Sequence, residues 1–72
     1  MLILQRRLGE EIVIRCPSGE VIRVVLTRIR DRERARIGVE ASRNVEINRR
    51  EVHEKKYKTK LPDLSGVRED DA

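Results

Sequence analysis

The stretch that decides the fold runs from residue 34 to residue 52 and reads RARIGVEASRNVEINRREV. Residues 34–39 alternate arginine with small or apolar residues, and residues 45–48 alternate apolar with polar residues. A period of two is the pattern of a strand with one buried face. Asn48 and Glu51 then have the spacing of a capping box, which predicts a helix over about 49–60 with Asn48 as its N-cap. This stretch predicts two strands followed by a helix.

Three further strands are predicted upstream of this stretch. Residues 2–7 begin apolar and become basic, residues 12–14 are β-branched, and residues 21–29 are rich in Val and Ile, which predicts the longest strand there. Gly9-Glu10 and the segment 16–19, with its proline and glycine, supply turns. Five short strands separated by turn signals predict an antiparallel, all-β fold with a C-terminal helix.

The region after the strands divides into a helix and a tail. The predicted helix has few apolar residues, so we expect it to be mostly solvated, with His53 on its surface. Residues 61–72 contain a proline, a glycine and the acidic run Glu69-Asp70-Asp71. Such a composition cannot bury enough apolar surface to order itself. We therefore expect one domain over residues 1–60 and a disordered tail over 61–72.

The length of 72 residues limits what one chain can bury. A domain of this size buries only about 60% of its unfolded surface, and disulfides, metals or oligomerisation usually compensate. Cys16 is the only cysteine, and Cys16 and His53 are the only soft metal ligands, so we expect no disulfide, metal or other cofactor. Oligomerisation remains. We expect a homodimer in which exchanged strands cover open edges and an apolar face.

The sequence favours neither an enzyme nor a membrane protein. It has no Ser–His–Asp set, no His near Cys16 in sequence, and no phosphate-binding glycine loop. No apolar run is long enough to span a bilayer, and the N-terminus does not resemble a signal peptide. A lone thiol is typical of a reducing compartment. We therefore expect a cytoplasmic protein without catalytic activity.

Charge is concentrated in the first fifty residues. They hold twelve arginines, no lysine and seven acidic residues, whereas residues 51–72 hold five basic and six acidic residues. Arginine suits bidentate recognition of phosphates and base edges, so nucleic acid is a candidate partner. The alternative is that these arginines only keep strand faces soluble. Tyr57 is the sole aromatic residue, so RNA contacts would depend on arginine, backbone groups and aliphatic side chains.

Three segments in order carry a family resemblance: MLILQRRLGE at 1–10, RIGV at 36–39 and VEINRREV at 45–52. Residues 1 to about 57 resemble the carbon storage regulator family (CsrA/RsmA). The resemblance implies a homodimer of five-stranded chains whose strands interleave, the first strand of one chain beside the last strand of the other. It also implies binding to GGA-containing sites in messenger RNA leaders near the ribosome-binding site. Such binding represses translation initiation or alters messenger stability, for example of flagellar or carbon-metabolism transcripts.

The resemblance also implies partners and site residues. Besides messenger RNA, the partners would be a second copy of the chain, small regulatory RNAs with GGA motifs, and a flagellar-assembly protein as antagonist. Arg49 would be the key cation of the RNA site. The residues carried over are Leu4, Arg6, Arg36, Ser42, Arg43, Val45, Ile47 and Arg49. The alternative for the three apolar members is core packing. For Arg49 it is a solvated helix start, although the helix dipole disfavours a cation there.

Some positions depart from the family pattern. The turn at 16–20 and the loop at 30–34 are longer than usual, and Ser42 stands where proline is common. Asn48 and Arg50 replace residues that are more often His and Glu. These departures leave the RNA preference open. The competing function is a β-dimer that binds a protein through the same surface, and a salt series distinguishes the two because RNA binding releases counterions.

Overall fold

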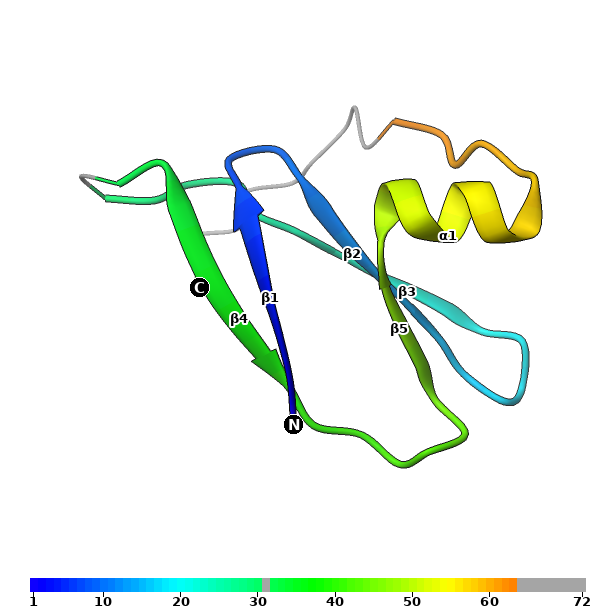
Figure 1. Ribbon diagram of the computed structural model, residues 1–72. Coiled ribbons are helices and arrows are strands. Elements are labelled where there is room, and N and C mark those ends of the chain that lie inside the picture. The colour runs from blue at the N-terminus through cyan, green and yellow to red at the C-terminus, as the bar shows by residue number, and fades with distance from the viewer. Residues whose placement is uncertain (31, 64–72) are drawn as a thin grey trace, which may run out of the picture.

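The computed structural model describes residues 1–30 and 32–63. Along the chain it contains β1 (Leu2–Arg7), β2 (Glu11–Arg15), β3 (Val21–Val25), β4 (Arg34–Val39), β5 (Glu46–Arg49) and α1 (Arg50–Tyr57), as Figure 1 shows. Every strand pairing is antiparallel. The predicted fold class, five short antiparallel strands and a C-terminal helix, is confirmed.

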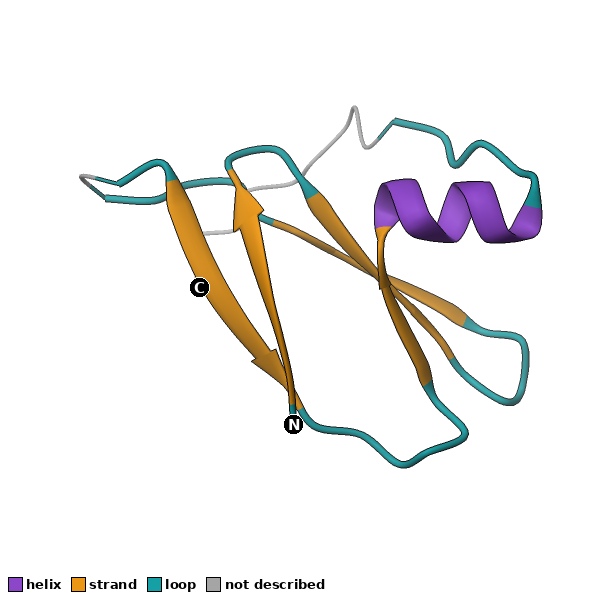
Figure 2. Cartoon of the chain, viewed as in Figure 1, coloured by secondary structure: helices purple, strands orange, loops and turns teal. Residues whose placement is uncertain are grey.

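The strands form two sheets. The ribbon of β1 and β4 is one, and the other has the order β3-β2-β5, which Figure 2 shows in orange. Among the described residues, β2 alone has a hydrogen-bonded strand on each side. The other four strands each leave one edge unpaired, which is the kind of edge that another strand can extend.

The two faces of the three-stranded sheet differ in chemistry. On one face the register aligns Ile12 with Val24, and Ile14 with both Ile22 and Ile47. The other face carries Glu11, Val13 and Arg15 of β2, and α1 packs against this face. Among residues 1–30 and 32–63, the buried apolar core is small: it consists of Ile12 and Val13, at 0% and 1% exposed.

Strand β3 is shorter than the sequence predicts. The prediction of a strand over 21–29 as the longest is wrong, because β3 ends at Val25 and the six-residue strands are β1 and β4. The reason lies in its partner: β2 begins at Glu11, which pairs with Val25. Beyond that pair, Leu26 exchanges backbone hydrogen bonds with the turn at Gly9 and Glu10. A strand continues only as far as its hydrogen-bonded neighbour does.

The helix begins and ends differently from its prediction. Arg49 is the N-cap and makes no side-chain capping hydrogen bond, so the assignment of Asn48 and Glu51 to a capping box is wrong. Asn48 lies in β5 and donates to Glu46 instead. The helix ends at Tyr57 rather than near residue 60, because Lys58 adopts the left-handed conformation (φ 49°) and its N–H donates to the carbonyl of Glu54. This is a C-terminal cap of the αL type.

His53 is not a surface residue as predicted. Its side chain is buried, and its ring centroid lies 4.8 Å from that of Tyr57. The two residues are four apart, so they share one face of α1. The sequence obscured this face because neither residue is strongly apolar. Within the described residues, no helix is long and apolar enough to cross a membrane.

Candidate nucleic-acid interface

Arg49 stands at the junction of β5 and α1. It is the last residue of β5 and the N-cap of the helix, with an extended backbone (φ −61°, ψ 149°). Its side chain is exposed, and it makes no hydrogen bond or ion pair with any other residue that the structure describes. A guanidinium in this state can offer its whole fork of donors to an anionic ligand.

Arg6 occupies a different environment. Its side chain is buried, and its Nη1 and Nη2 donate to the two carboxylate oxygens of Glu51 at 2.9 and 2.8 Å. Nη1 also donates to the carbonyl of Glu11 at 3.2 Å. The Glu51 carboxylate raises the pKa of Arg6 above its ordinary value. This bidentate pair fixes the end of β1 to the first turn of α1.

Glu51 links Arg6 to Arg49. Hydrogen bonds from Arg6 lower the pKa of Glu51 to about 2, and the charge of Arg49 contributes in the same direction. Two cations therefore surround one carboxylate at this corner of the molecule. One of the two, Arg6, is committed to that carboxylate, and Arg49 remains available.

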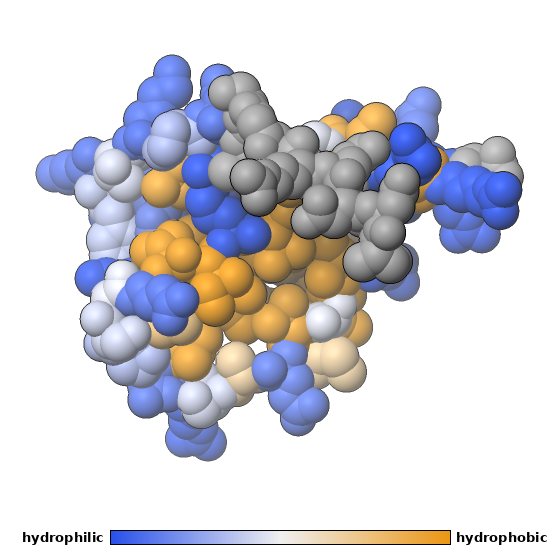
Figure 3. Space-filling model, turned by 180° about the vertical axis from the view of Figure 1, so that it is seen from behind, coloured by the Kyte–Doolittle hydropathy of each residue, from blue (hydrophilic) through white to orange (hydrophobic). Residues whose placement is uncertain are grey.

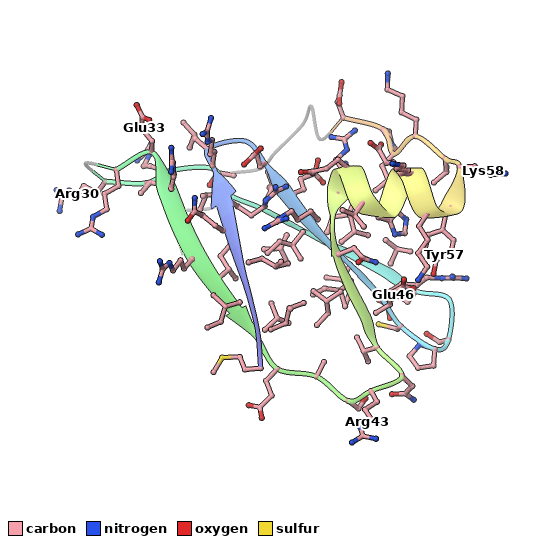
Figure 4. All side chains as sticks on the ribbon, viewed as in Figure 1. Arg30, Glu33, Arg43, Glu46, Tyr57 and Lys58 are labelled. Carbon is pink, nitrogen blue, oxygen red and sulfur yellow. The ribbon has the colours of Figure 1, made fainter. Side chains whose placement is uncertain are left out.

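The loop between β4 and β5 holds three of the predicted residues. Ser42 donates from its hydroxyl to Asn44 at 2.6 Å, and its carbonyl accepts from the N–H of Val45 at 3.0 Å. Ser42 and Arg43 are exposed and Val45 is half-buried. Figure 4 shows Arg43 at the tip of this loop, pointing away from the sheets. The internal hydrogen bonds give the loop a definite shape.

The remaining predicted residues do not all share one face. Leu4 pairs with Ile37, whereas Arg36 pairs with Gln5. Because directly paired residues point to the same side and neighbours alternate, Leu4 and Arg36 lie on opposite faces of the β1–β4 ribbon. Ile47 points to the same side of β5 as Arg49, and it pairs with Ile14. The structure thus groups Arg6 with Arg49, and separates Arg36 from Leu4.

A buried carboxylate that the sequence did not reveal lies under α1. Glu11 accepts from Arg23 at 2.8 and 3.1 Å and from Arg50 at 2.7 Å. A buried charge is tolerated when it is paired and its hydrogen bonds are satisfied, as here. These partners are 12 and 39 residues away from Glu11, so no local motif could indicate them.

The same two arginines hold the chain that follows α1. Arg23 donates to the carbonyl of Pro62 at 2.6 Å, and Arg50 donates to the carbonyl of Leu61 at 2.6 Å. Asp63 also lies 3.3 Å from Arg50. The first three residues of the predicted tail thus contact the domain, and residues 64–72 lie outside the described residues.

The far end of α1 is closed by a second ion cluster. Glu46 accepts from Lys56 and from the hydroxyl of Tyr57, and Figure 4 shows Glu46 and Tyr57 next to each other. Hydrogen bonds from these two residues lower the pKa of Glu46 to about 2. The guanidinium of Arg15 lies over the Tyr57 ring, 4.4 Å from its centroid. These contacts fasten α1 to β2 and β5.

The described residues contain no group of three or more His, Cys, Asp or Glu side chains that could hold a metal ion. What the structure presents instead is an exposed cation, Arg49, at the junction of β5 and α1, an ordered polar loop at the other end of β5, and half-buried aliphatic side chains. This combination is suited to hydrogen-bonding an anion or the edges of unstacked bases.

Comparison with known proteins gives matches by sequence. The model of the CsrA family, described as a global regulator protein family, matches residues 1–58. A protein from Thermotoga petrophila named translational regulator CsrA is 38% identical over 78 residues, which cover 99% of this chain and 88% of that protein. A protein of the same name from Rhodopirellula baltica is 43% identical over 54 residues, which cover 75% of this chain and 70% of that protein. No solved structure gives a significant match.

Proposed function

Because the chain belongs to the CsrA family of global regulator proteins, we propose that it is a post-transcriptional regulator that binds messenger RNA. The bound elements are GGA-containing sites in messenger leaders near the ribosome-binding site. Occupying such a site blocks translation initiation or changes the stability of the messenger. Its relatives from Thermotoga petrophila and Rhodopirellula baltica are named translational regulators, which supports the proposal.

The observation that carries the proposal is the state of Arg49. It is an exposed guanidinium, without a partner among the described residues, at a helix N-terminus where the dipole disfavours a cation. Within the fold, its charge contributes to the lowered pKa of Glu51 only after the hydrogen bond and charge of Arg6, so fold stability gives a weak reason for an arginine here. An anionic or base-edge ligand gives a stronger one, because charge-assisted hydrogen bonds from an arginine fork are among the strongest available to a protein surface.

The other predicted residues receive distinct roles in this proposal. Arg6 is a positioning residue, since its guanidinium is committed to Glu51 and holds the β1 end beside the start of α1. Ser42 and Arg43 contact RNA from the β4–β5 loop. Half-buried aliphatic groups at the edges of the strands pack against bases, and these are Leu4, Val45 and Ile47. Arg36, on the other face of the ribbon, contacts the backbone of the RNA.

The functional unit in this proposal is a homodimer. The sheet face that carries Ile12 leaves Ile22 and Val24 at 43% and 37% exposed, and Figure 3 shows apolar side chains gathered on one side of the molecule. A second chain would cover such a surface. The pairings β1–β4 and β2–β5 can also be made between chains that exchange strands. This exchange would produce the interleaved dimer with two equivalent RNA sites.

Further partners follow from the same proposal. Small regulatory RNAs with GGA motifs would compete for the site, and a flagellar-assembly protein could act as antagonist. The domain would comprise residues 1–60, with 61–72 as a tail, and the protein would work in the cytoplasm without a cofactor.

The test is a fluorescence titration of a GGA hairpin and of a control hairpin in which GGA is changed to CCA. The wild-type protein should prefer the GGA hairpin. Arg49→Ala should lose roughly ten- to hundredfold in affinity for it, because a lost charge-assisted contact costs about 1.5–3 kcal/mol.

The matched control is Lys55→Ala, which removes one positive charge from an exposed position of α1. It should bind nearly as well as the wild type because exposed charges are screened over a Debye length. If the two variants lose equal affinity, or if the protein binds the two hairpins equally well, the interaction is only nonspecific attraction of RNA to a basic surface. Binding that is insensitive to salt would favour the protein-binding alternative instead.

A further inference from the structure

A second basic surface lies away from Arg49. A cavity of about 600 Å³ opens where the β3–β4 loop meets the β1–β4 ribbon. The residues that line it are Gln5, Ile29, Arg32, Arg34, Ala35 and Arg36. We call its three cations, Arg32, Arg34 and Arg36, the arginine groove. The loop beside it projects from the body of the molecule, with Arg30 and Glu33 at its end in Figure 4.

Among the described residues, no acidic group compensates the arginine groove. None of the described residues that line the cavity is Asp or Glu. Within the residues that the structure describes, none of its three arginines has a carboxylate oxygen within ion-pair distance, whereas Arg6, Arg23 and Arg50 each have at least one. The difference separates arginines that stabilise the fold from arginines that face an open cavity.

The register of β1 and β4 places two like charges next to each other beside the groove. Arg34 lies directly opposite Arg7 in the β1–β4 ribbon, and both side chains are exposed. Like charges opposite each other on antiparallel strands destabilise the pair. Folding gains nothing from gathering these charges, so their position is better explained by an anionic ligand.

The chemistry of the cavity indicates which anion. A planar guanidinium fork matches the oxygens of a phosphate, and no aromatic side chain is present to stack a base. Arg34 and Arg36 are two residues apart on one strand, so their attachment points lie about 7 Å apart along the ribbon. A row of cations at this spacing suits a chain of successive phosphates better than one small ion.

We infer that the arginine groove binds the phosphate backbone of the RNA segment that flanks the recognised GGA element. The inference rests on the proposed function and extends it, because Arg36 belongs both to the predicted RNA residues and to the groove. The loop that supplies Arg32 is also the one that is longer than usual for the family. The groove adds affinity for flanking RNA without reading its sequence.

The experiment compares Arg32→Gln/Arg34→Gln with the wild-type protein on two RNAs over a salt series. One RNA is a GGA hairpin with a paired stem, and the other is a short single-stranded GGA oligomer without flanks. The double variant should lose about tenfold in affinity for the hairpin, as expected for lost charge-assisted contacts on an exposed surface. The slope of log affinity against log salt should fall by about 1–2, and binding of the short oligomer should not change.

The charge-matched control is Lys55→Gln/Lys60→Gln, since both lysines are exposed. It should leave hairpin affinity and salt slope unchanged. The melting temperature of Arg32→Gln/Arg34→Gln should equal or exceed that of the wild type, because the substitution relieves the repulsion between Arg34 and Arg7. If the variant folds normally, its loss of RNA affinity can be assigned to the missing arginines of the groove.

Three results would overturn the inference. The first is that Arg32→Gln/Arg34→Gln leaves the hairpin affinity and its salt dependence unchanged. The second is that this variant loses as much affinity for the short oligomer as for the hairpin. The third is that Lys55→Gln/Lys60→Gln loses as much hairpin affinity as the arginine variant does. The first result is also the one expected if the groove binds an acidic protein segment instead of RNA. One further outcome separates the two proposals. If the wild-type protein shows no preference for the GGA hairpin over the CCA hairpin, the proposed function is wrong. If Arg32→Gln/Arg34→Gln still lowers the salt dependence of hairpin binding in that case, the inference about the groove is supported.

Discussion

The two faces of the three-stranded sheet are stabilised in different ways. The face under α1 is polar: Glu11 is paired with Arg23 and Arg50, and Glu46 is paired with Lys56 and Tyr57. The opposite face is apolar, and Ile22 and Val24 remain substantially exposed on it. The polar face is complete within one chain. Among the described residues the apolar face is left partly uncovered, and this difference shows where the proposed homodimer would place its second chain.

Ion pairing also divides the arginines into two groups. Those under α1 and beside its start are paired with carboxylates, and they determine how α1 sits on the sheet. Arg49 and the arginine groove have no such partners among the described residues. In a chain with twelve arginines in its first fifty residues, ion pairing separates the structural cations from those that the proposal assigns to RNA, which composition alone cannot do.

The largest effect is expected from weakening the apolar face at its centre. Ile12 is 0% exposed, so Ile12→Ala should lower the free energy of unfolding by about 2–5 kcal/mol through lost burial and the resulting cavity. Urea unfolding followed by circular dichroism measures this change. Val52→Ala is the control, because Val52 is exposed on α1, and it should change stability by less than about 0.5 kcal/mol. Equal costs at the two positions would contradict the assignment of Ile12 to the core.

A smaller effect is expected from breaking the pair that ties β1 to α1. Glu51→Gln removes the bidentate partner of the buried Arg6, whose other carboxylate neighbour, Glu10, lies 3.9 Å away. It should cost about 1.5–3 kcal/mol of unfolding free energy, the range for hydrogen bonds to charged groups. It should also weaken GGA binding, since Arg6 positions the corner beside Arg49. The control Glu40→Gln removes an exposed carboxylate. If Glu51→Gln unfolds at the same urea concentration as the wild type, the pair does not hold this corner.

The smallest effect is a pH dependence of the clusters at the two ends of α1. The pKa of Glu46 and that of Glu51 are each lowered to about 2 from an ordinary value of 4.5. A lowered folded-state pKa means that the stabilisation is full above about pH 4.5 and is lost as the pH falls towards 2. Urea midpoints should therefore decline over this window in the wild type. The decline should be shallower in Glu46→Gln/Glu51→Gln, and an identical pH profile would show that these ion pairs do not stabilise the fold.

Much of the fold could be predicted because its signals are local. Strands β1 and β4 follow the predicted segments, and the predicted turn at 16–19 forms, with the N–H of Gly19 donating to the carbonyl of Cys16. The length of β3 could not be predicted, since it depends on where its partner β2 begins. The buried position of His53 and the double pairing of Glu11 depend on contacts between residues far apart in sequence.

The candidate site was predicted less completely than the fold. Exposure of Arg49, Ser42 and Arg43 fits their proposed role, but the sequence did not distinguish the buried, paired Arg6 from the exposed Arg49. The opposite orientations of Leu4 and Arg36 follow from strand register. A one-residue shift reverses every side chain, so the sequence alone could not assign these faces.

The most direct test of the account is the mass of the folded protein in solution. If the apolar face around Ile22 and Val24 is completed by a second chain, sedimentation equilibrium at low micromolar concentration should give twice the mass of one chain, with no folded monomer. Dilution should then cause dissociation together with loss of the β-sheet signal in circular dichroism. A folded monomer that persists at these concentrations would contradict the account, because it would show that one chain is complete without its partner.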